Sequence, residues 1–190
     1  MPWLDRVMID AEYGLEATGV FASLSEILTR VFSLLIYPLT LAVYPRVTML
    51  WHQRDWKSAD KILRYALLIG TGVSLFTVVV MHLAQSIVFK LLLPATTIMQ
   101  AKVDPYLIAA LTASGAIWSM GLLVHKPLEL QSNTHGMLIA MGVALAVKIA
   151  GNLFGIPKWG MSGVAYASIV SGVVYCFACV LIATRDQSHS

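Results

Sequence analysis

The sequence predicts an all-α protein, a polytopic membrane helix bundle. Only 12% of the 190 residues are charged, about half of the roughly 25% that is usual in soluble domains, and the mean hydropathy is +0.75. So few charges cannot cover a surface that faces water. Apolar runs of about 20 residues cross a hydrocarbon core as helices, which satisfy their own backbone polar groups. The alternating segments of about 10 residues that form membrane β-barrels are not visible.

Five apolar segments have this length, and we expect each to be a full transmembrane helix. They span residues 20–44, 66–93, 106–124, 137–156 and 161–183. An odd number of spans entered from outside is unusual in a chain whose first residues, rich in acids, do not resemble a signal peptide. We therefore expect a partial helix and an outer loop in residues 1–16. The single transmembrane bundle, 1–190, is then expected to be a fragment of a longer protein.

The basic residues predict the orientation in the membrane. Residues 46–64, between the first two spans, carry five of the 13 Lys and Arg residues, namely Arg46, Arg54, Lys57, Lys61 and Arg64. Lys and Arg are enriched in the cytoplasmic loops of membrane proteins. We therefore expect 46–64 to be a cytoplasmic linker and the C-terminus to lie in the cytoplasm.

Seven polar residues recur every three or four positions in the first full span. They are Ser23, Glu26, Arg30, Ser33, Tyr37, Thr40 and Tyr44, and we call them the polar stripe. Their spacing places them on one helical face, and Glu26 and Arg30 are spaced for an ion pair. Two interpretations remain open: an ion pair that locks this helix to a neighbour, or a water-filled path. Both predict that Glu26 and Arg30 face the interior of the bundle.

Lys148 is a cation near the centre of the apolar segment 137–156, and Asn152 shares its face one turn later. A charge at the centre of a membrane costs at least about 2.5–3.5 kcal/mol, so such residues usually have a function. The ammonium could pair with Glu26, or it could face a cavity and attract an anionic passenger such as a phosphate group.

Other function classes have little support in the sequence. There is no phosphate-binding glycine loop, catalytic constellation or spaced set of metal ligands, so we expect no enzyme activity, no cofactor and no metal. Cys176 and Cys179 lie in the last span without a nearby histidine. The net charge of +3 requires no nucleic-acid partner. Gly163, Ala167 and Ser171 recur every four residues, a spacing that lets helices approach closely in lipid.

Three stretches resemble the second half of bacterial polysaccharide flippases, and together they cover almost the whole chain. "WLDRVMIDAEYGLEATGVFASLSEI", with Asp5 and Arg6, is similar to the family's seventh helix and the start of the next one. "YPLTLAVYPRVTMLWHQRDWKSADKILRYAL" is similar to its eighth helix and cytoplasmic linker. "KIAGNLFGIPKWGMSGVAYASIVSG", with Lys148 and Asn152, is similar to the junction of the eleventh and twelfth helices.

These flippases belong to the multidrug/oligosaccharidyl-lipid/polysaccharide exporter superfamily. The resemblance implies two six-helix bundles around a central cavity, which move undecaprenyl-pyrophosphate-linked oligosaccharide across the bacterial inner membrane by alternating access. The chain matches only the second bundle. The partners implied are the lipid-linked oligosaccharide, membrane lipids and a missing N-terminal bundle, in the same gene or a separate chain. The residues expected along the substrate path are Asp5, Arg6, Glu26, Arg30, Tyr37, Lys148 and Asn152.

Two alternatives to a flippase remain open. The chain could be half of a related multidrug or cation antiporter, which would need an acidic cation-binding site, and Glu26 is the only acid deep in the five full spans. It could also be part of a membrane scaffold that transports nothing. A scaffold, however, gains nothing from Lys148 and a charged stripe.

Overall fold

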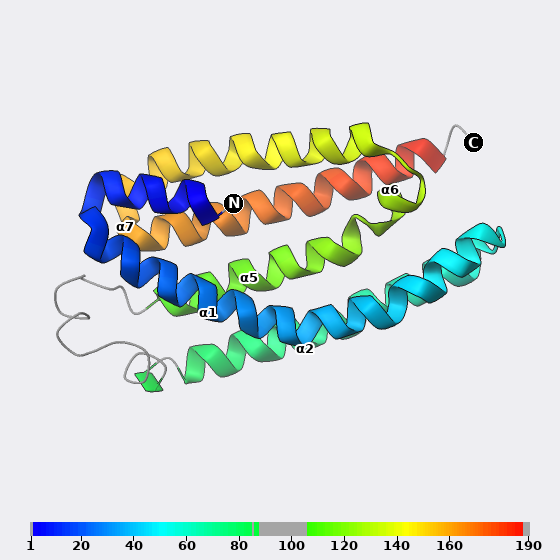
Figure 1. The fold of residues 1–190 in the computed structure, drawn as a ribbon, viewed down its shortest axis with the longest axis horizontal. Helices are drawn as coiled ribbons and strands as arrows, with labels where there is room; N and C mark the ends of the chain where they lie inside the picture. Colours follow the sequence, from blue (N-terminus) through cyan, green and yellow to red (C-terminus); the bar gives the residue numbers. More distant parts are fainter. Residues whose placement is uncertain (1, 85, 88–105, 188–190) are drawn as a thin grey trace.

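The computed structural model describes residues 2–84, 86–87 and 106–187, and all the regular structure in these residues is helical. The helices are α1 (Pro2–His52), α2 (Trp56–Leu83), α5 (Leu107–Val124), α6 (Lys126–Leu130) and α7 (Thr134–Gln187). They pack as a bundle of long, roughly aligned helices (Figure 1). The predicted all-α bundle is thus confirmed. Of the described helices, α1, α2, α7 and the stretch Leu107–Leu130 are long and apolar enough to cross a membrane, which is compatible with a membrane protein.

Helix α1 changes direction at Gly14. This residue has φ 79° and ψ 176°, a conformation that glycine adopts easily and that an L side chain makes costly. The segment before Gly14 folds back toward the middle of the molecule (Figure 1); we call residues 2–13 the N-terminal arm. The arm is helical, and a bend of one residue at Gly14 joins it to the rest of α1, in the region where an outer loop was expected.

Helix α7 contains both of the last two predicted spans, 137–156 and 161–183. The chain reverses at Gly160 (φ 59°, ψ −140°), and the two arms lie side by side (Figure 1). Counted as continuous elements, the described residues contain four long apolar helices, because α7 includes both arms and a single glycine with non-helical φ and ψ makes the reversal between them. A Cβ on Gly155 or Gly163 would contact the backbone of the other residue. The expected close packing of small residues is confirmed here.

The α1–α2 junction is tighter than predicted. Most of the expected linker, 46–64, is helical, and only Gln53–Asp55 separates the two helices. Arg54 adopts a positive φ of 61° in this turn. The Asp55 side chain accepts a hydrogen bond from the Ser58 backbone N–H and so caps α2, and hydrogen bonding from Ser58 holds the pKa of Asp55 below its usual value. The predicted span 66–93 lies in α2 as far as Leu83, and its last part falls outside the described residues.

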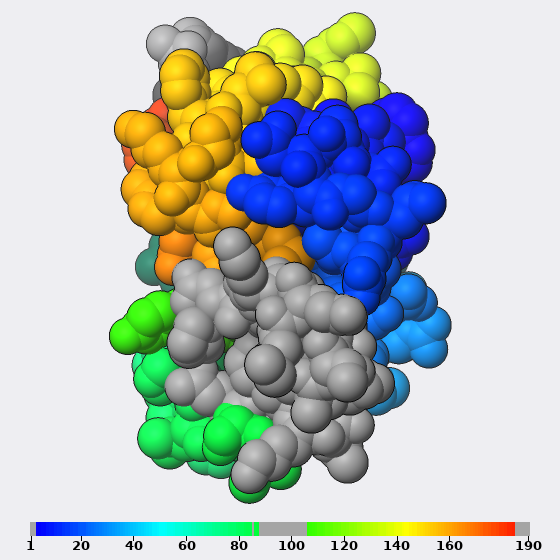
Figure 2. All heavy atoms as spheres, turned by 90° about the vertical axis from the view of Figure 1, so that its left-hand side faces the viewer, coloured from blue at the N-terminus to red at the C-terminus, as the bar shows by residue number. Residues whose placement is uncertain are grey.

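The main core joins α1, α5 and α7. It is built from apolar side chains such as Phe21 and Leu24 of α1, Ile108 of α5 and Val164 of α7. At the end of the bundle where both chain reversals lie, the Tyr13 hydroxyl donates a hydrogen bond to the Ile156 carbonyl at 3.2 Å. Figure 2 shows this end, with the blue start of α1 beside the gold bend of α7. The packing fixes the N-terminal arm against α7.

Candidate functional site

A buried polar network surrounds Lys148. The Lys148 side chain, on the first arm of α7, is almost completely buried, with the residue 2% exposed. Its Nζ lies 2.9 Å from Asp5 Oδ1 and 3.3 Å from the Val164 carbonyl oxygen, and it donates a hydrogen bond to Ser168 Oγ. A buried cation is tolerated only when it is paired and hydrogen-bonded. Here the N-terminal arm supplies the countercharge, and the second arm of α7 supplies the two neutral acceptors.

Asn152 belongs to the same network. Its Nδ2 donates a hydrogen bond to Asp5 Oδ1 at 3.0 Å, and the residue is fully buried. Its Oδ1 has no hydrogen-bond partner among the described residues. One carboxylate oxygen therefore receives hydrogen bonds from two residues that lie one turn apart on α7. The network fastens the N-terminal arm to both arms of α7.

This geometry corrects two expectations for Lys148. The ammonium does not pair with Glu26, and it does not line an open path, because Asp5 neutralises it inside the bundle. The reason is the bend at Gly14. It places Asp5 against α7, where Asp5 contacts Asn152, a residue 147 positions later in the sequence. Spacing along one helix contains no information about such a contact.

The polar stripe lies on the outer surface of the bundle. Its charged members are well exposed, with 52% of the Glu26 side chain and 76% of the Arg30 side chain accessible. Leu24, Leu28 and Phe32 occupy the buried side of α1. Glu26 and Arg30 therefore do not face the interior of the described bundle, because large apolar side chains fill it.

Two arginines flank Glu26 on this surface. Arg30 Nη2 lies 2.6 Å from Glu26 Oε1, and Arg6 Nη2 lies 3.9 Å from Glu26 Oε2. Tyr37, further along the stripe, is exposed as well. Asp5 and Arg6 are consecutive residues of the N-terminal arm, so their side chains point in different directions. Asp5 is buried against α7, and Arg6 lies beside the polar stripe. The seven predicted residues thus form two groups: buried Asp5, Lys148 and Asn152, and exposed Arg6, Glu26, Arg30 and Tyr37.

Sequence reasoning missed a second polar cluster, where α1 meets the α5–α6 junction. Lys126 Nζ lies 3.9 Å from the centre of the Tyr44 ring and 2.6 Å from Glu129 Oε2. The Tyr44 hydroxyl donates a hydrogen bond to Glu129 Oε1 at 3.3 Å. His125 Nε2 is 3.6 Å from the same carboxylate. The available signal was the spacing of Lys126 and Glu129, which suits an ion pair on one helical turn.

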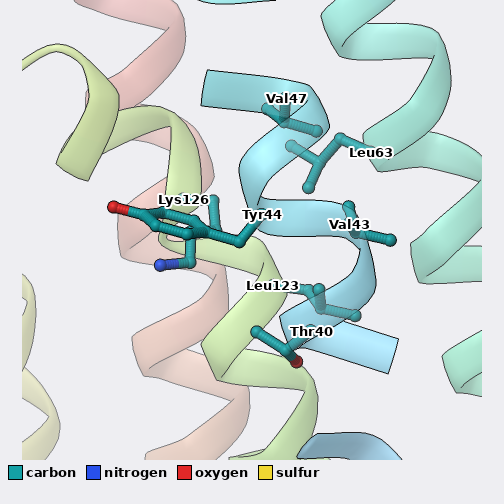
Figure 3. A pocket seen from close by; sticks show the side chains of 7 residues that line it. All are labelled: Thr40, Val43, Tyr44, Val47, Leu63, Leu123 and Lys126. Atoms are coloured by element: carbon teal, nitrogen blue, oxygen red, sulfur yellow. The ribbon is translucent and has the colours of Figure 1, made fainter. Parts of the chain in front are cut away.

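The cavity beside this cluster is too small for a substrate. Tyr44 and Lys126 form one of its walls, and Val43, Leu63 and Leu123 close it from α1, α2 and α5 (Figure 3). Its volume is about 10 Å³, at the lower limit for a single water molecule. The cluster is therefore best understood as a fastening between α1 and the α5–α6 junction.

The part of the chain that the structure describes contains no candidate metal site. No group of three or more His, Cys, Asp or Glu residues there could hold a metal ion. Cys176 and Cys179 are free thiols. What the arrangement offers instead is an exposed charged surface on α1, where two guanidinium groups flank one carboxylate.

Comparisons with protein-family models, with curated proteins and with solved structures find no match to this chain.

Proposed function

We propose that this chain is one lobe of a membrane transporter that flips undecaprenyl-pyrophosphate-linked oligosaccharide across the bacterial inner membrane. The exposed polar stripe of α1 is the observation that carries the proposal. Glu26 and Arg30 would cost at least about 2.5–3.5 kcal/mol each if they faced acyl chains. A water-filled path avoids this cost, and a second bundle placed opposite α1 would complete such a path.

The chemistry of the stripe suits a pyrophosphate group. A guanidinium is always charged and presents planar donors that match phosphate oxygens in pairs. Arg30 and Arg6 both contact Glu26, so the three side chains together carry one net positive charge. Arg30 is the more exposed of the two arginines, and we assign it the main role in attracting the passenger. Lys148 has a structural role in this proposal, because it links the N-terminal arm to α7 through Asp5.

The cation antiporter has weaker support. It needs an acid that is free to bind an ion, whereas both acids that the sequence places near the path already have basic partners: Asp5 pairs with Lys148 and Glu26 pairs with Arg30. A scaffold would leave the exposed charges of α1 without a role.

Cysteine labelling tests the path. Cysteines that replace Ser33 and Tyr37, both exposed on the stripe, should react with a membrane-impermeant thiol reagent when the lobe is produced with an N-terminal bundle. The control is Leu34→Cys, because Leu34 is 77% exposed on the same helix but lies outside the stripe. This cysteine should react at least tenfold more slowly, since a lipid-facing thiol seldom ionises. Equal reaction rates at the three positions would exclude a water-filled path along the stripe.

Complementation tests the passenger. In bacteria that lack their own flippase, Arg30→Gln in the assembled transporter should lower surface-glycan display about tenfold, because a hydrogen bond to a charged group contributes about 1.5–3 kcal/mol. Arg30→Lys should retain part of the activity, because it keeps the charge and loses the paired donors. Normal display from Arg30→Gln at normal protein level would contradict the pyrophosphate role.

A further inference from the structure

The first turns of α2 present a basic groove on the outside of the molecule. Lys57, Lys61 and Arg64 are separated by four and three residues, which places them on one face of the helix. They line a groove of about 380 Å³, together with Asp60, Tyr65 and Leu68. The polar stripe of α1 contributes no residue to this groove, so it is a separate feature.

The groove carries a net positive charge. Its one acid, Asp60, is paired with Arg64, at 2.8 Å from Oδ2 to Nη2. Lys61 has no ion-pair partner among the described residues. Three cations against one carboxylate leave two positive charges to attract an anion from the surroundings.

An apolar strip continues the same face of the helix. Leu68, Leu75 and Val79 follow Arg64 at intervals of four, seven and four residues, which keeps them in line with the basic residues. Leu68 is 69% exposed and Leu75 is 64% exposed. Gly72 lies between them, with no atom within 4 Å of the place where a Cβ would stand. The strip is therefore open along its length.

The neighbouring residues favour a position of the groove at a membrane surface. Trp51 and Trp56 pack edge to face, with ring centroids 4.4 Å apart, across the turn that precedes the groove. Tryptophan is enriched where the membrane meets water. The distance along the helix from Lys61 to Val79 is about 27 Å at a rise of 1.5 Å per residue. In a membrane-spanning α2 this length would place the cations at headgroup level and the apolar strip in the hydrocarbon.

We propose that this face of α2 binds an anionic glycerophospholipid. The phosphate lies among Lys57, Lys61 and Arg64, and an acyl chain follows Leu68, Leu75 and Val79. Net charge favours an anionic headgroup over a zwitterionic one, whose own ammonium is repelled by the three cations. The site would anchor the start of α2 in the membrane surface whatever the chain transports.

Native mass spectrometry of the full chain in detergent tests the proposal, with phosphatidylglycerol and phosphatidylcholine of identical acyl chains as probes. The chain should retain phosphatidylglycerol in preference. Lys61→Gln should weaken phosphatidylglycerol binding about fivefold, the effect expected for one basic residue at an anionic surface. The triple change of Lys57, Lys61 and Arg64 to Gln should abolish the preference. Lys61→Arg should preserve it, and equal helicity by circular dichroism verifies folding.

Lys158→Gln is the matched control, because it removes one exposed positive charge outside the groove and should leave the preference unchanged. Leu75→Ser should weaken both lipids alike. Equal retention of the two lipids by the unmodified chain would overturn the proposal, as would an equal effect of Lys158→Gln and Lys61→Gln. Displacement of phosphatidylglycerol by millimolar inorganic phosphate would identify a site for phosphate alone and would also overturn it.

Discussion

Asp5 and Lys148 form the contact on which the position of the N-terminal arm depends. Each is buried, and each lies within 3.0 Å of a polar atom of another segment. Removing one member of such a pair leaves an uncompensated buried charge, which costs about 3–5 kcal/mol, whereas replacing both is often nearly neutral. Loss of either residue alone is therefore strongly destabilising, even though the intact pair adds little to the stability of the folded protein.

The residue-scale prediction follows from this asymmetry. Lys148→Met and Asp5→Asn should each lower the free energy of unfolding by about 3–5 kcal/mol, and the double variant should lose less than either single one. Unfolding in mixed detergent micelles, followed by circular dichroism, measures the three values. Arg30→Gln is the control and should cost about 0–1 kcal/mol, because its ion pair is exposed. Additive losses would show that the two residues act separately.

Part of this network could be predicted and part could not. Helical spacing predicted that Lys148 and Asn152 share a face, and both indeed lie next to Asp5. The identity of the partner depends on the bend at Gly14, which a helical pattern does not reveal. Spacing also predicted that the polar stripe lies on one face of α1, but not that this face is on the outer surface of the bundle. In a membrane bundle both the interior and the lipid-facing surface are apolar, so the opposite face of α1 gave no indication of which side is buried.

At the scale of the helices, two glycines decide where the chain reverses. Gly14 and Gly160 have the positive φ values that end the straight course of α1 and α7. Apolar length predicted where the spans lie, but it did not distinguish a loop from a reversal at one residue. The largely helical structure of residues 46–64 was missed for a similar reason, because basic residues are compatible with exposed helix ends as well as with a loop.

The element-scale prediction concerns Gly160→Ala. At φ 59° and ψ −140° a Cβ is strained, so this change should destabilise the chain by about 1–3 kcal/mol. Gly142→Ala is the matched control on the same helix, since no atom lies within 4 Å of the place where its Cβ would stand and its φ is helical. That change should be neutral or stabilising by about 0.5–1 kcal/mol. Thermal unfolding of the two variants compares them directly, and equal melting temperatures would contradict a strained reversal.

The whole molecule has two distinct ends. The α1–α2 turn and the α5–α6 junction lie at one end, and the bends at Gly14 and Gly160 lie at the other (Figure 1). The basic groove of α2 begins at the first of these ends. Since Lys and Arg favour the cytoplasmic side, we expect the α1–α2 turn to lie in the cytoplasm and the α7 bend to lie outside.

Cysteine accessibility in bacterial cells tests this assignment. Gln53 lies in the α1–α2 turn and Lys158 lies two residues before the bend at Gly160, and both are exposed, so each can be replaced without disturbing the core. A cysteine at position 158 should react with an impermeant maleimide in intact cells, and a cysteine at 53 should react only after the membrane is permeabilised. The native thiols Cys176 and Cys179 lie within α7 and are replaced by alanine beforehand. Labelling of position 53 in intact cells would reverse the orientation, and it would place the basic groove of α2 against the outer leaflet.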